Sequence, residues 1–561
     1  MRFRKKQDGF SVRAITGTHV VMLGMDADKA KAKDLLGFAI HRTDPVEKEA
    51  YWLTGMRTFE ASYPNPPPGA LASTQEHPIQ DFLWSDFTAK PGRKYTYQVV
   101  PVTGRPKNLK YGTGVTIDVE TEEEEGKTHS IYFNRAVIGS QAYSREFKLP
   151  PNKLQGDEQK KAYAWLSRGL EEALLAFLAE AKDKTFGLRA AVYEFDYDNV
   201  IAAFGKAQKA CNNVQIIFDA RIPGSAKAKA DATSRVGKVK EAMKKYGLSK
   251  GSIPRTKDPN FISHNKFVVL LKNDKPVAVW TGSTNITASG IFGQANVGHL
   301  IRDSKVAASY LAYWERLKSD PAVKDLQPQN EKATPTLKTT PPPAGITPLF
   351  SPRKGIAQLQ WYADELGAAD KMSCFTGAFG VNKLLLEKYK TPQDYFRYLF
   401  LEKWGVTKAT AAAAEDELSH DPNTLVAVGA FLGEELLHRW LKELKNTLSK
   451  NIRYVHTKFL IVNPLGDDPV VVTGSANFSD ASTKNNDENM VVIRGDQRVA
   501  DIYLGEFMRL WRHHYFRFIV SEIDQKTGQA TGINYLDPTS DWTKDFYNPK
   551  SVKNLQRETF A

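Results

Sequence analysis

The chain has 561 residues, with 77 lysines and arginines against 64 aspartates and glutamates, so its formal net charge is +13 and its pI is about 9.2. This length predicts three or four units of ordinary domain size, and the positive balance favours a polyanionic partner, either nucleic acid or an anionic lipid surface. Only two cysteines are present, Cys211 and Cys374, which argues against a disulfide framework and a cysteine-based metal site.

The first ten residues are basic but no apolar stretch follows them, so they do not form the pattern of a cleaved signal peptide. No run in the chain approaches the ~20 apolar residues of a spanning helix. We therefore expect a cytoplasmic protein without a transmembrane segment. Export by a route that needs no cleaved signal stays open.

Residues 1–125 are predicted to form an all-β domain. Short apolar strands are expected at 18–23 and 36–41, and the turn at Pro91-Gly92 leads into the alternation of Tyr95, Tyr97 and Val99. This pattern resembles the fibronectin type III or immunoglobulin-like β-sandwich, in which a tyrosine fixes the corner before a strand. The segment has no cluster of catalytic residue types, so we expect it to be a spacer or recognition module.

Residues 126–330 are predicted to form an α/β lobe. Apolar residues at helical spacing mark a helix over 165–178, and strands at 188–195 and 214–219 flank a helix near 198–210. This β-α-β order suits a parallel core. A lysine-rich segment at 227–250 follows, and it is either a track for a phosphate backbone or an ordinary solvated helix face.

A duplicated motif dominates the rest of the chain. His264-Asn265-Lys266 is followed by Gly282-Ser283-Thr284-Asn285, and His456-Thr457-Lys458 is followed by Gly474-Ser475-Ala476-Asn477. Each residue of the second copy lies 192 positions after its counterpart. Each copy is predicted to be a β-hairpin, which brings its histidine, lysine and asparagine together.

The second copy belongs to a second α/β lobe. A Pro/Thr-rich linker is expected at 331–345, the lobe itself at 346–520, and helices over 409–418 and 434–448 within it. The adjacent histidines His513 and His514 are assigned a structural use. The tail at 521–561 contains three aromatic residues, and we expect it to pack along the catalytic lobes.

Histidine, lysine and asparagine, the residue types that both copies of the motif bring together, suit a phosphodiester. Lysine supplies positive charge for the non-bridging oxygens, and asparagine adds directed N–H donors. Histidine can act as a nucleophile or a proton carrier near neutral pH. Two histidines allow two roles across one P–O bond: one attacks phosphorus, and the other protonates the leaving oxygen.

The paired motifs resemble those of the phospholipase D superfamily, over roughly residues 160 to 520. The resemblance implies two α/β lobes packed face to face, one active site at their seam, a phosphohistidine intermediate, and no metal or other cofactor. By the same resemblance His264 is the nucleophile and His456 the general acid. Lys266, Lys458, Asn285 and Asn477 hold the phosphate oxygens, with Ser283 and Ser475 behind them.

Two departures from the superfamily pattern stand out. Many members carry an aspartate five residues after the lysine, where this chain has Leu271 and Asn463. Many also carry an acidic residue eleven positions after the asparagine, which here is Glu488 in the second copy but Asn296 in the first. Glu488 is expected to orient a histidine, of its own lobe or of the opposite one, so the two histidines should not be equivalent.

The substrate class stays open at this stage. The positive charge, the lack of a signal peptide and the missing aspartates favour a nuclease. The build of two lobes in one chain and the aromatic content of 11% suit a phospholipase or phosphatidyltransferase, with peripheral membrane contact. A third alternative is a non-catalytic module that binds phosphate. Because both half-sites lie in one chain, a monomer is expected.

Overall fold

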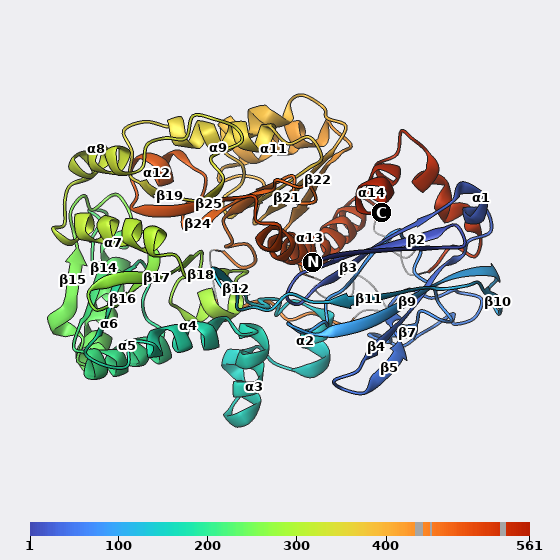
Figure 1. Ribbon diagram of the computed structural model, residues 1–561, viewed down its shortest axis with the longest axis horizontal. Coiled ribbons are helices and arrows are strands. Elements are labelled where there is room, and N and C mark those ends of the chain that lie inside the picture. Colours follow the sequence, from blue (N-terminus) through green and yellow to red (C-terminus); the bar gives the residue numbers. More distant parts are fainter. Residues whose placement is uncertain (432–440, 449–451, 528–534) are drawn as a thin grey trace.

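The computed structural model describes residues 1–431, 441–448, 452–527 and 535–561. Figure 1 shows an antiparallel β-domain at one end of the molecule and two α/β lobes, one above the other, at the other end. The long helix α13 (Gln497–Thr527) lies between the β-domain and the lobes. Both cysteines, Cys211 and Cys374, are buried free thiols.

The N-terminal domain has two antiparallel sheets. The first has the order β1 (Arg2–Gln7), β2 (Phe10–Thr16), β3 (Val21–Ala27) and β8 (Leu83–Asp86). The second has the order β10 (Asn108–Tyr111), β9 (Lys94–Arg105), β4 (Gly37–Asp44) and β5 (Glu49–Trp52), and β11 (Val115–Glu120) also pairs with β9. Smaller elements are α1 (Lys29–Ala32) and the strand pair β6 (Thr54–Gly55) and β7 (Ala72–Ser73).

One apolar cluster is shared by the two sheets. It includes Val12 and Leu23 of the first sheet and Tyr97 and Ile117 of the second. The hydroxyl of Tyr95 accepts a hydrogen bond from the backbone N–H of Lys90, at 2.9 Å. This contact ties the strand to the turn that precedes it, as expected for a tyrosine at a corner.

Each lobe is built on a seven-stranded sheet, and the two sheets have the same strand order. The order in lobe 1 is β12 (His129–Phe133), β18 (Val297–Ile301), β17 (Lys275–Gly282), β16 (Lys266–Lys272), β13 (Phe186–Val192), β14 (Val214–Asp219), β15 (Ser252–Arg255). The order in lobe 2 is β19 (Gly345–Ser351), β25 (Glu488–Arg494), β24 (Val470–Gly474), β23 (Phe459–Val462), β20 (Met372–Gly377), β21 (Phe396–Leu401), β22 (Thr424–Val428). In both lobes three central strands are consecutive antiparallel partners, and the strands that flank them, β12 and β13 or β19 and β20, also pair with them antiparallel. Only the last three strands of each order pair in parallel with one another.

The helices of lobe 1 differ from the prediction at one point. The segment expected as one helix over 165–178 is two helices, because Arg168 (φ 48°) and Gly169 (φ 90°) adopt left-handed backbone conformations and turn the chain. The helices of this lobe are α2 (Gln141–Glu146), α3 (Gly156–Ser167), α4 (Leu170–Ala179), α5 (Asp198–Cys211), α6 (Ala226–Lys245), α7 (Ser304–Lys318) and α8 (Val323–Ala333).

Lobe 2 carries α9 (Ala357–Gly367), α10 (Lys383–Leu386), α11 (Lys408–Ser419) and α12 (Asp480–Lys484). Residues 434–440 of the helix expected over 434–448 lie outside the described residues, and the described part, 441–448, is not helical. The linker also differs from the prediction, since α8 extends into it. The linker is packed rather than free, because Arg353 and the Trp361 indole donate hydrogen bonds to the carbonyl oxygens of Thr334 and Thr339.

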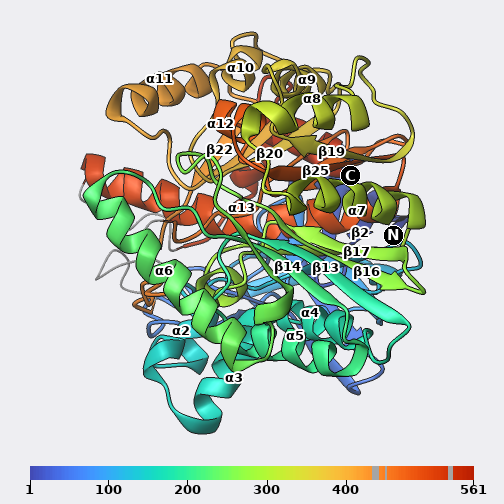
Figure 2. The ribbon, with the colours of Figure 1, turned by 90° about the vertical axis from the view of Figure 1, so that its left-hand side faces the viewer.

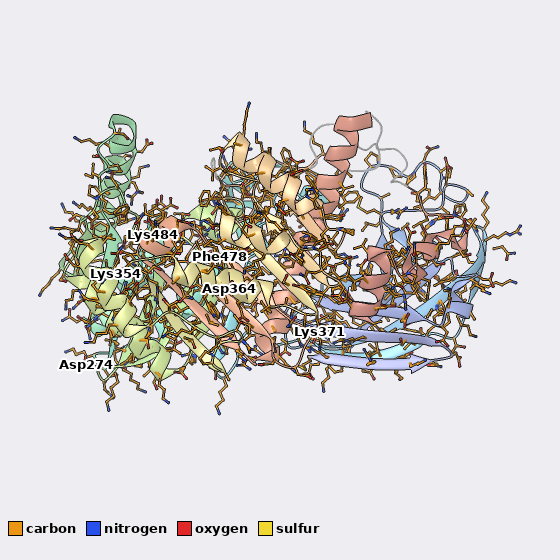
Figure 3. The ribbon with its side chains drawn as sticks, turned by 90° about the horizontal axis from the view of Figure 1, so that it is seen from above. Asp274, Lys354, Asp364, Lys371, Phe478 and Lys484 are labelled. Atoms are coloured by element: carbon orange, nitrogen blue, oxygen red, sulfur yellow. The ribbon has the colours of Figure 1, made fainter. Side chains whose placement is uncertain are left out.

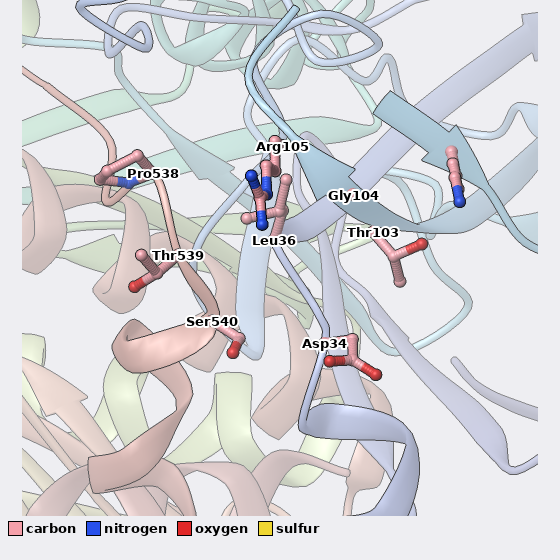
Figure 4. Close-up of a pocket in the computed structure, with 9 residues that line it drawn as sticks. Asp34, Leu36, Thr103, Gly104, Arg105, Pro538, Thr539 and Ser540 are labelled. Atoms are coloured by element: carbon pink, nitrogen blue, oxygen red, sulfur yellow. The ribbon is translucent and has the colours of Figure 1, made fainter. Parts of the chain in front are cut away.

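The C-terminal tail packs on a different partner from the one expected. Phe546, in the 3-10 helix Ser540–Tyr547, joins the core of the β-domain, and Trp542 and Tyr547 lie against the same cluster. Helix α14 (Val552–Phe560) contacts β3 and β8. Figure 4 shows Pro538, Thr539 and Ser540 facing Asp34 and Arg105 of the β-domain across a pocket of about 430 Å³. The expectation that the tail packs along the catalytic lobes is therefore wrong.

Candidate active site

Two hairpins, one in each lobe, present the predicted residues. In lobe 1 the hairpin is β16–β17, with His264 just before β16 and Asn285 just after β17. In lobe 2 it is β23–β24, with His456 and Asn477 in the same places. The histidines, lysines, serines and Glu488 are all buried, and Asn477 is partly exposed.

The two hairpins meet through the backbone. The amide of His264 donates to the carbonyl of Asp487 at 2.9 Å, and the amide of His456 donates to the carbonyl of Ala295 at 3.1 Å. Ser263 with Asp487 and Ala295 with Val455 are parallel β-bridges. The contacts are related by the same shift of 192 residues as the motifs, so the two lobes meet with twofold pseudosymmetry about one site.

Each histidine is supported by the opposite lobe. The Nδ1 atom of His264 lies 2.9 Å from Oε2 of Glu488, which also accepts a hydrogen bond from the Ser475 hydroxyl at 2.6 Å. The Nδ1 atom of His456 lies 2.9 Å from Oδ1 of Asn296, which accepts from Ser283 at 2.8 Å. An acceptor at Nδ1 selects the tautomer whose lone pair is on Nε2. Glu488 thus orients the histidine of the other lobe, and Asn296 is its neutral counterpart.

The two lysines hold their ammonium groups beside the imidazoles. Lys266 Nζ donates to the carbonyl oxygen of His264 at 2.6 Å, and Lys458 Nζ donates to that of His456 at 2.7 Å. Burial lowers the pKa of Lys266 to about 8, although Glu488 acts in the opposite direction. Burial and Lys266 lower the pKa of Lys458 well below its usual range. A bound anion would offset the repulsion between two ammonium groups that are kept close together in a buried site.

Both imidazoles are held neutral in the free protein. Burial, Lys266 and Lys458 lower the pKa of His264 well below 6.5. Burial and the same two lysines, followed by His264, lower the pKa of His456 well below 6.5. Burial raises the pKa of Glu488 to about 8, against the effect of Lys266. A neutral imidazole with a free Nε2 lone pair is the form that attacks an electrophile.

The asparagines are placed differently in the two lobes. Asn285 donates from Nδ2 to Oε2 of Glu194 at 2.6 Å. Among the described residues the buried Oδ1 atoms of Asn285 and Asn477 have no hydrogen-bond partner. These oxygens can only accept, so a phosphate oxygen would have to be bound by the N–H groups on Nδ2 of each amide. Phe478 adopts a left-handed backbone conformation (φ 50°) directly after Asn477. Its ring, labelled in Figure 3, packs on Tyr362 and Phe375 and holds that turn in place.

Lobe 1 also supplies an aromatic wall. The Tyr193 ring lies 5.1 Å from the His264 ring in an edge-to-face arrangement, and Lys266 Nζ lies 5.4 Å from its centre. Arg235 of α6 lies on the same ring at 5.6 Å and donates to Asp219. The register of β20 against β23 puts Ala378 at the equivalent place in lobe 2. The lobe 1 half of the site is therefore more crowded and more polar.

Sequence reasoning missed three of these residues. Glu194 and Tyr193 follow the carboxyl end of β13, the edge of the sheet where the histidines lie, and that position was the available signal. Arg255, which bonds Asp487 from Nε at 2.9 Å across the seam, gave no signal because the pair is 232 residues apart. His513 and His514 contact the carbonyls of Gly139 and Ala430, in keeping with a structural use.

Among the described residues, no group of three or more histidine, cysteine, aspartate or glutamate side chains is arranged to hold a metal ion. In the same part of the chain, no helix has the length and apolar character needed to cross a membrane.

Two segments of the chain, residues 174–318 and 429–511, match the family described as "Cardiolipin synthase, PLD-like domain". They contain both histidine motifs, so the part of the chain that carries the motifs is similar to a phospholipase D-like domain. A stretch of 62 residues, 11% of this chain, is 36% identical to the mitochondrial cardiolipin hydrolase of Canis lupus familiaris. The chain spans about a fifth of the length of that relative (22%).

Similar solved structures include the phosphatidylserine synthase of Haemophilus influenzae Rd KW20, at 12% identity and a TM-score of 0.42, over 70% of this chain and 93% of that one. The yeast tyrosyl-DNA phosphodiesterase has 12% identity and a TM-score of 0.31, over 58% and 88% of the two chains. The phospholipase D family member Nuc of Salmonella typhimurium has 20% identity and a TM-score of 0.21, over 30% and 95%.

Proposed function

We propose that this chain belongs to the phospholipase D superfamily and is a phosphodiesterase that works through a phosphohistidine and needs no metal. The observation that carries the proposal is the pair of histidines, each held at Nδ1 by the opposite lobe and each beside a lysine. Because one chain supplies both halves, a monomer is sufficient.

The reaction has two steps. Nε2 of His264 attacks phosphorus while His456 gives a proton to the leaving oxygen, so the P–O bond breaks as the P–N bond forms. His456 then takes a proton from water, whose oxygen attacks phosphorus and releases His264. Lys266, Lys458, Asn285 and Asn477 bind the non-bridging oxygens. The bound anion offsets the charge of the lysines, which favours the protonated form of His456 that the first step needs.

Nucleic acid is the substrate that we favour, because of helix α6. Lys229, Lys240 and Lys244 are exposed and recur at a helical spacing that places them along one stripe. The helix reaches the site through Arg235, which contacts Asp219 and Tyr193. Figure 2 shows α6 projecting on the same side of the molecule as the far end of α13. Such a stripe can follow a phosphate backbone into the site.

A phospholipid is the second candidate, and a different observation favours it. Ile222, Phe379 and Val406 are 41%, 44% and 68% exposed. Each follows the carboxyl end of a strand, at the sheet edge where the histidines lie. Exposed apolar residues at a rim beside a basic helix would suit contact with an anionic membrane surface.

The test is a parallel assay in excess EDTA. Wild-type protein and a His264→Asn variant receive labelled single- and double-stranded DNA, RNA, and vesicles of phosphatidylcholine and phosphatidylglycerol. We expect the wild type alone to cleave nucleic acid. Activity that appears only with added metal would contradict the mechanism. Tight binding without cleavage would instead favour a non-catalytic phosphate-binding module.

Two variants separate the substrates. Changing Lys229, Lys240 and Lys244 to Gln should weaken nucleic-acid binding and lower the slope of log K against log salt by about 0.9 for each lost contact. The control changes Lys29, Lys31 and Lys33, three exposed lysines in or beside α1 at the opposite end of the molecule. If Phe379→Ser with Val406→Ser lowers vesicle hydrolysis while the lysine variant changes nothing, the phospholipid candidate is favoured.

The fibronectin type III-like identity of residues 1–125 also stays a proposal. The two sheets with a common core and the Tyr95 contact to Lys90 support it.

A further inference from the structure

A cavity of about 740 Å³ lies between the β-domain and the catalytic lobes. Its walls come from the β-domain, from the segment 135–142, from the end of α3, and from α13, which separates the two parts of the molecule in Figure 1. The volume falls in the range of small-molecule sites. It is separate from the two histidine hairpins, none of whose residues lines it.

One wall of this cavity is strongly basic. Arg168, Arg509 and Arg135 lie around a single buried carboxylate, Glu506. Arg168 and Arg509 both donate to the Oε2 atom of Glu506, at 2.5 and 2.8 Å. Although burial acts to raise it, these two arginines lower the pKa of Glu506 to about 2, so the carboxylate is ionised. One negative charge thus faces three positive ones.

Arg135 is the one of these three arginines that does not pair with Glu506. Its guanidinium lies 4.2 Å from the centre of the Trp165 ring, and among the described residues it has no carboxylate or hydrogen-bond partner. Burial, Arg168 and Arg509 lower the pKa of Arg135 to about 9, which reflects the cost of keeping this charge. A cation in a half-buried site without a counterion is a place where an anion gains binding energy.

The other walls add much apolar surface, and several of their polar groups are already bonded within the protein. The apolar side chains include Leu53, Trp84, Phe87, Val137 and Trp165. Gln141 donates to the carbonyl of Leu441, and Asp86 accepts from Arg42 and Tyr97. The cavity therefore offers positive charge and apolar surface rather than the set of donors and acceptors that a nucleobase would need.

We propose that this cavity binds a single-chain anionic lipid, with its phosphate or carboxylate head at Arg135 and its acyl chain along Leu53, Trp84, Phe87 and Val137. Such a ligand would contact the β-domain and α13 together. It would hold the β-domain against the catalytic lobes, because a ligand that binds only the docked form stabilises that form. This inference is independent of the catalytic proposal and of its substrate.

The test is titration calorimetry on the full-length chain, with tryptophan fluorescence as a second readout because Trp84 and Trp165 line the cavity. The probes are dodecyl phosphate and dodecanoate below their critical micelle concentrations, dodecanol, inorganic phosphate and adenosine monophosphate. The variant is Arg135→Gln. The control is Arg302→Gln, an arginine of lobe 1 that pairs with Glu180 at the surface.

We expect dodecyl phosphate or dodecanoate to bind saturably to the wild type and the control, and at least about tenfold more weakly to Arg135→Gln, from the loss of one charge-assisted contact. Without ligand, Arg135→Gln should unfold at an unchanged or higher temperature, because it removes an uncompensated charge. Equal binding to Arg135→Gln would overturn the proposal. So would dodecanol, inorganic phosphate or adenosine monophosphate binding as tightly as the anionic lipids.

Discussion

The two halves of the active site share one backbone geometry but differ in charge. His264 is supported by a carboxylate, Glu488, whereas His456 is supported by a carboxamide, Asn296, at the equivalent position. Lobe 1 adds Tyr193 and Glu194, where lobe 2 has Ala378 and then Phe379. Pseudosymmetry thus brings the two histidines to one place, and in the proposed mechanism the departures from it give them different tasks.

The histidines themselves give the largest expected effect. His264→Asn should abolish turnover of every substrate, because no nucleophile remains. His456→Asn should slow a substrate with a poor leaving group by about 10² to 10⁴. It should leave the first step with a p-nitrophenyl phosphodiester much less affected, since that leaving group needs no proton. Single-turnover release of p-nitrophenol measures the difference.

Equal losses in both variants with the activated substrate would show that the two roles are not divided in this way. The control is the thermal unfolding temperature of each variant, which should show that the fold persists.

The next largest effect on the rate is expected from changing Glu488 and Asn296, the groups that accept at Nδ1 of the two imidazoles. Glu488→Gln should lower kcat by about 10- to 100-fold, the usual range for the partner that orients a functional imidazole. Asn296→Asp should be milder and should raise the pKa of His456, because an anion beside an imidazole favours its charged form. Kinetics and an NMR titration of the two imidazoles check both. Identical effects of the two changes would contradict the asymmetry.

The pH dependence of the rate is expected to follow the protonation of Glu488 and Lys266. Burial raises the pKa of Glu488 to about 8, so below that pH it gains a proton and no longer accepts from His264. Burial lowers the pKa of Lys266 to about 8, so above that pH it loses the charge that binds phosphate. The rate should therefore peak near pH 8 and fall on both sides.

Glu488→Gln sharpens this test. The acid limb due to Glu488 should disappear. The basic limb should move to lower pH, because Glu488 acts to raise the pKa of Lys266. A pH profile of kcat/KM that keeps its acid limb in the variant would assign that limb to another group.

The smallest expected effect is at the aromatic wall. Tyr193→Leu removes the ring beneath Lys266 Nζ, an interaction worth about 0.5 to 2 kcal/mol in such settings. KM should rise by about 2- to 30-fold with a smaller change in kcat. Tyr193→Phe keeps the ring and serves as the matched control. If Tyr193→Phe is as impaired as Tyr193→Leu, the hydroxyl and not the ring is important.

Short-range patterns allowed much of this site to be predicted from the sequence. Strand periodicity and the turn after each strand place His264, Lys266 and Asn285 together, because the hairpin closes over about twenty residues. Glu488 lies 224 residues from His264, and no local pattern states which histidine it meets. The aromatic tail shows the same limit. Trp542, Phe546 and Tyr547 require burial, but only the tertiary structure selects the β-domain as their partner.

Each lobe supplies the acceptor for the other lobe's histidine, and this exchange limits how such a site can be assembled. A single lobe has no acceptor for its own histidine, so it would be complete only beside a second copy. In a symmetric pair of identical lobes, both acceptors would have to be carboxylates or both carboxamides. Fusion of the two lobes into one chain removes that constraint. Glu488 and Asn296 can then differ, and one imidazole can be tuned for attack and the other for proton transfer.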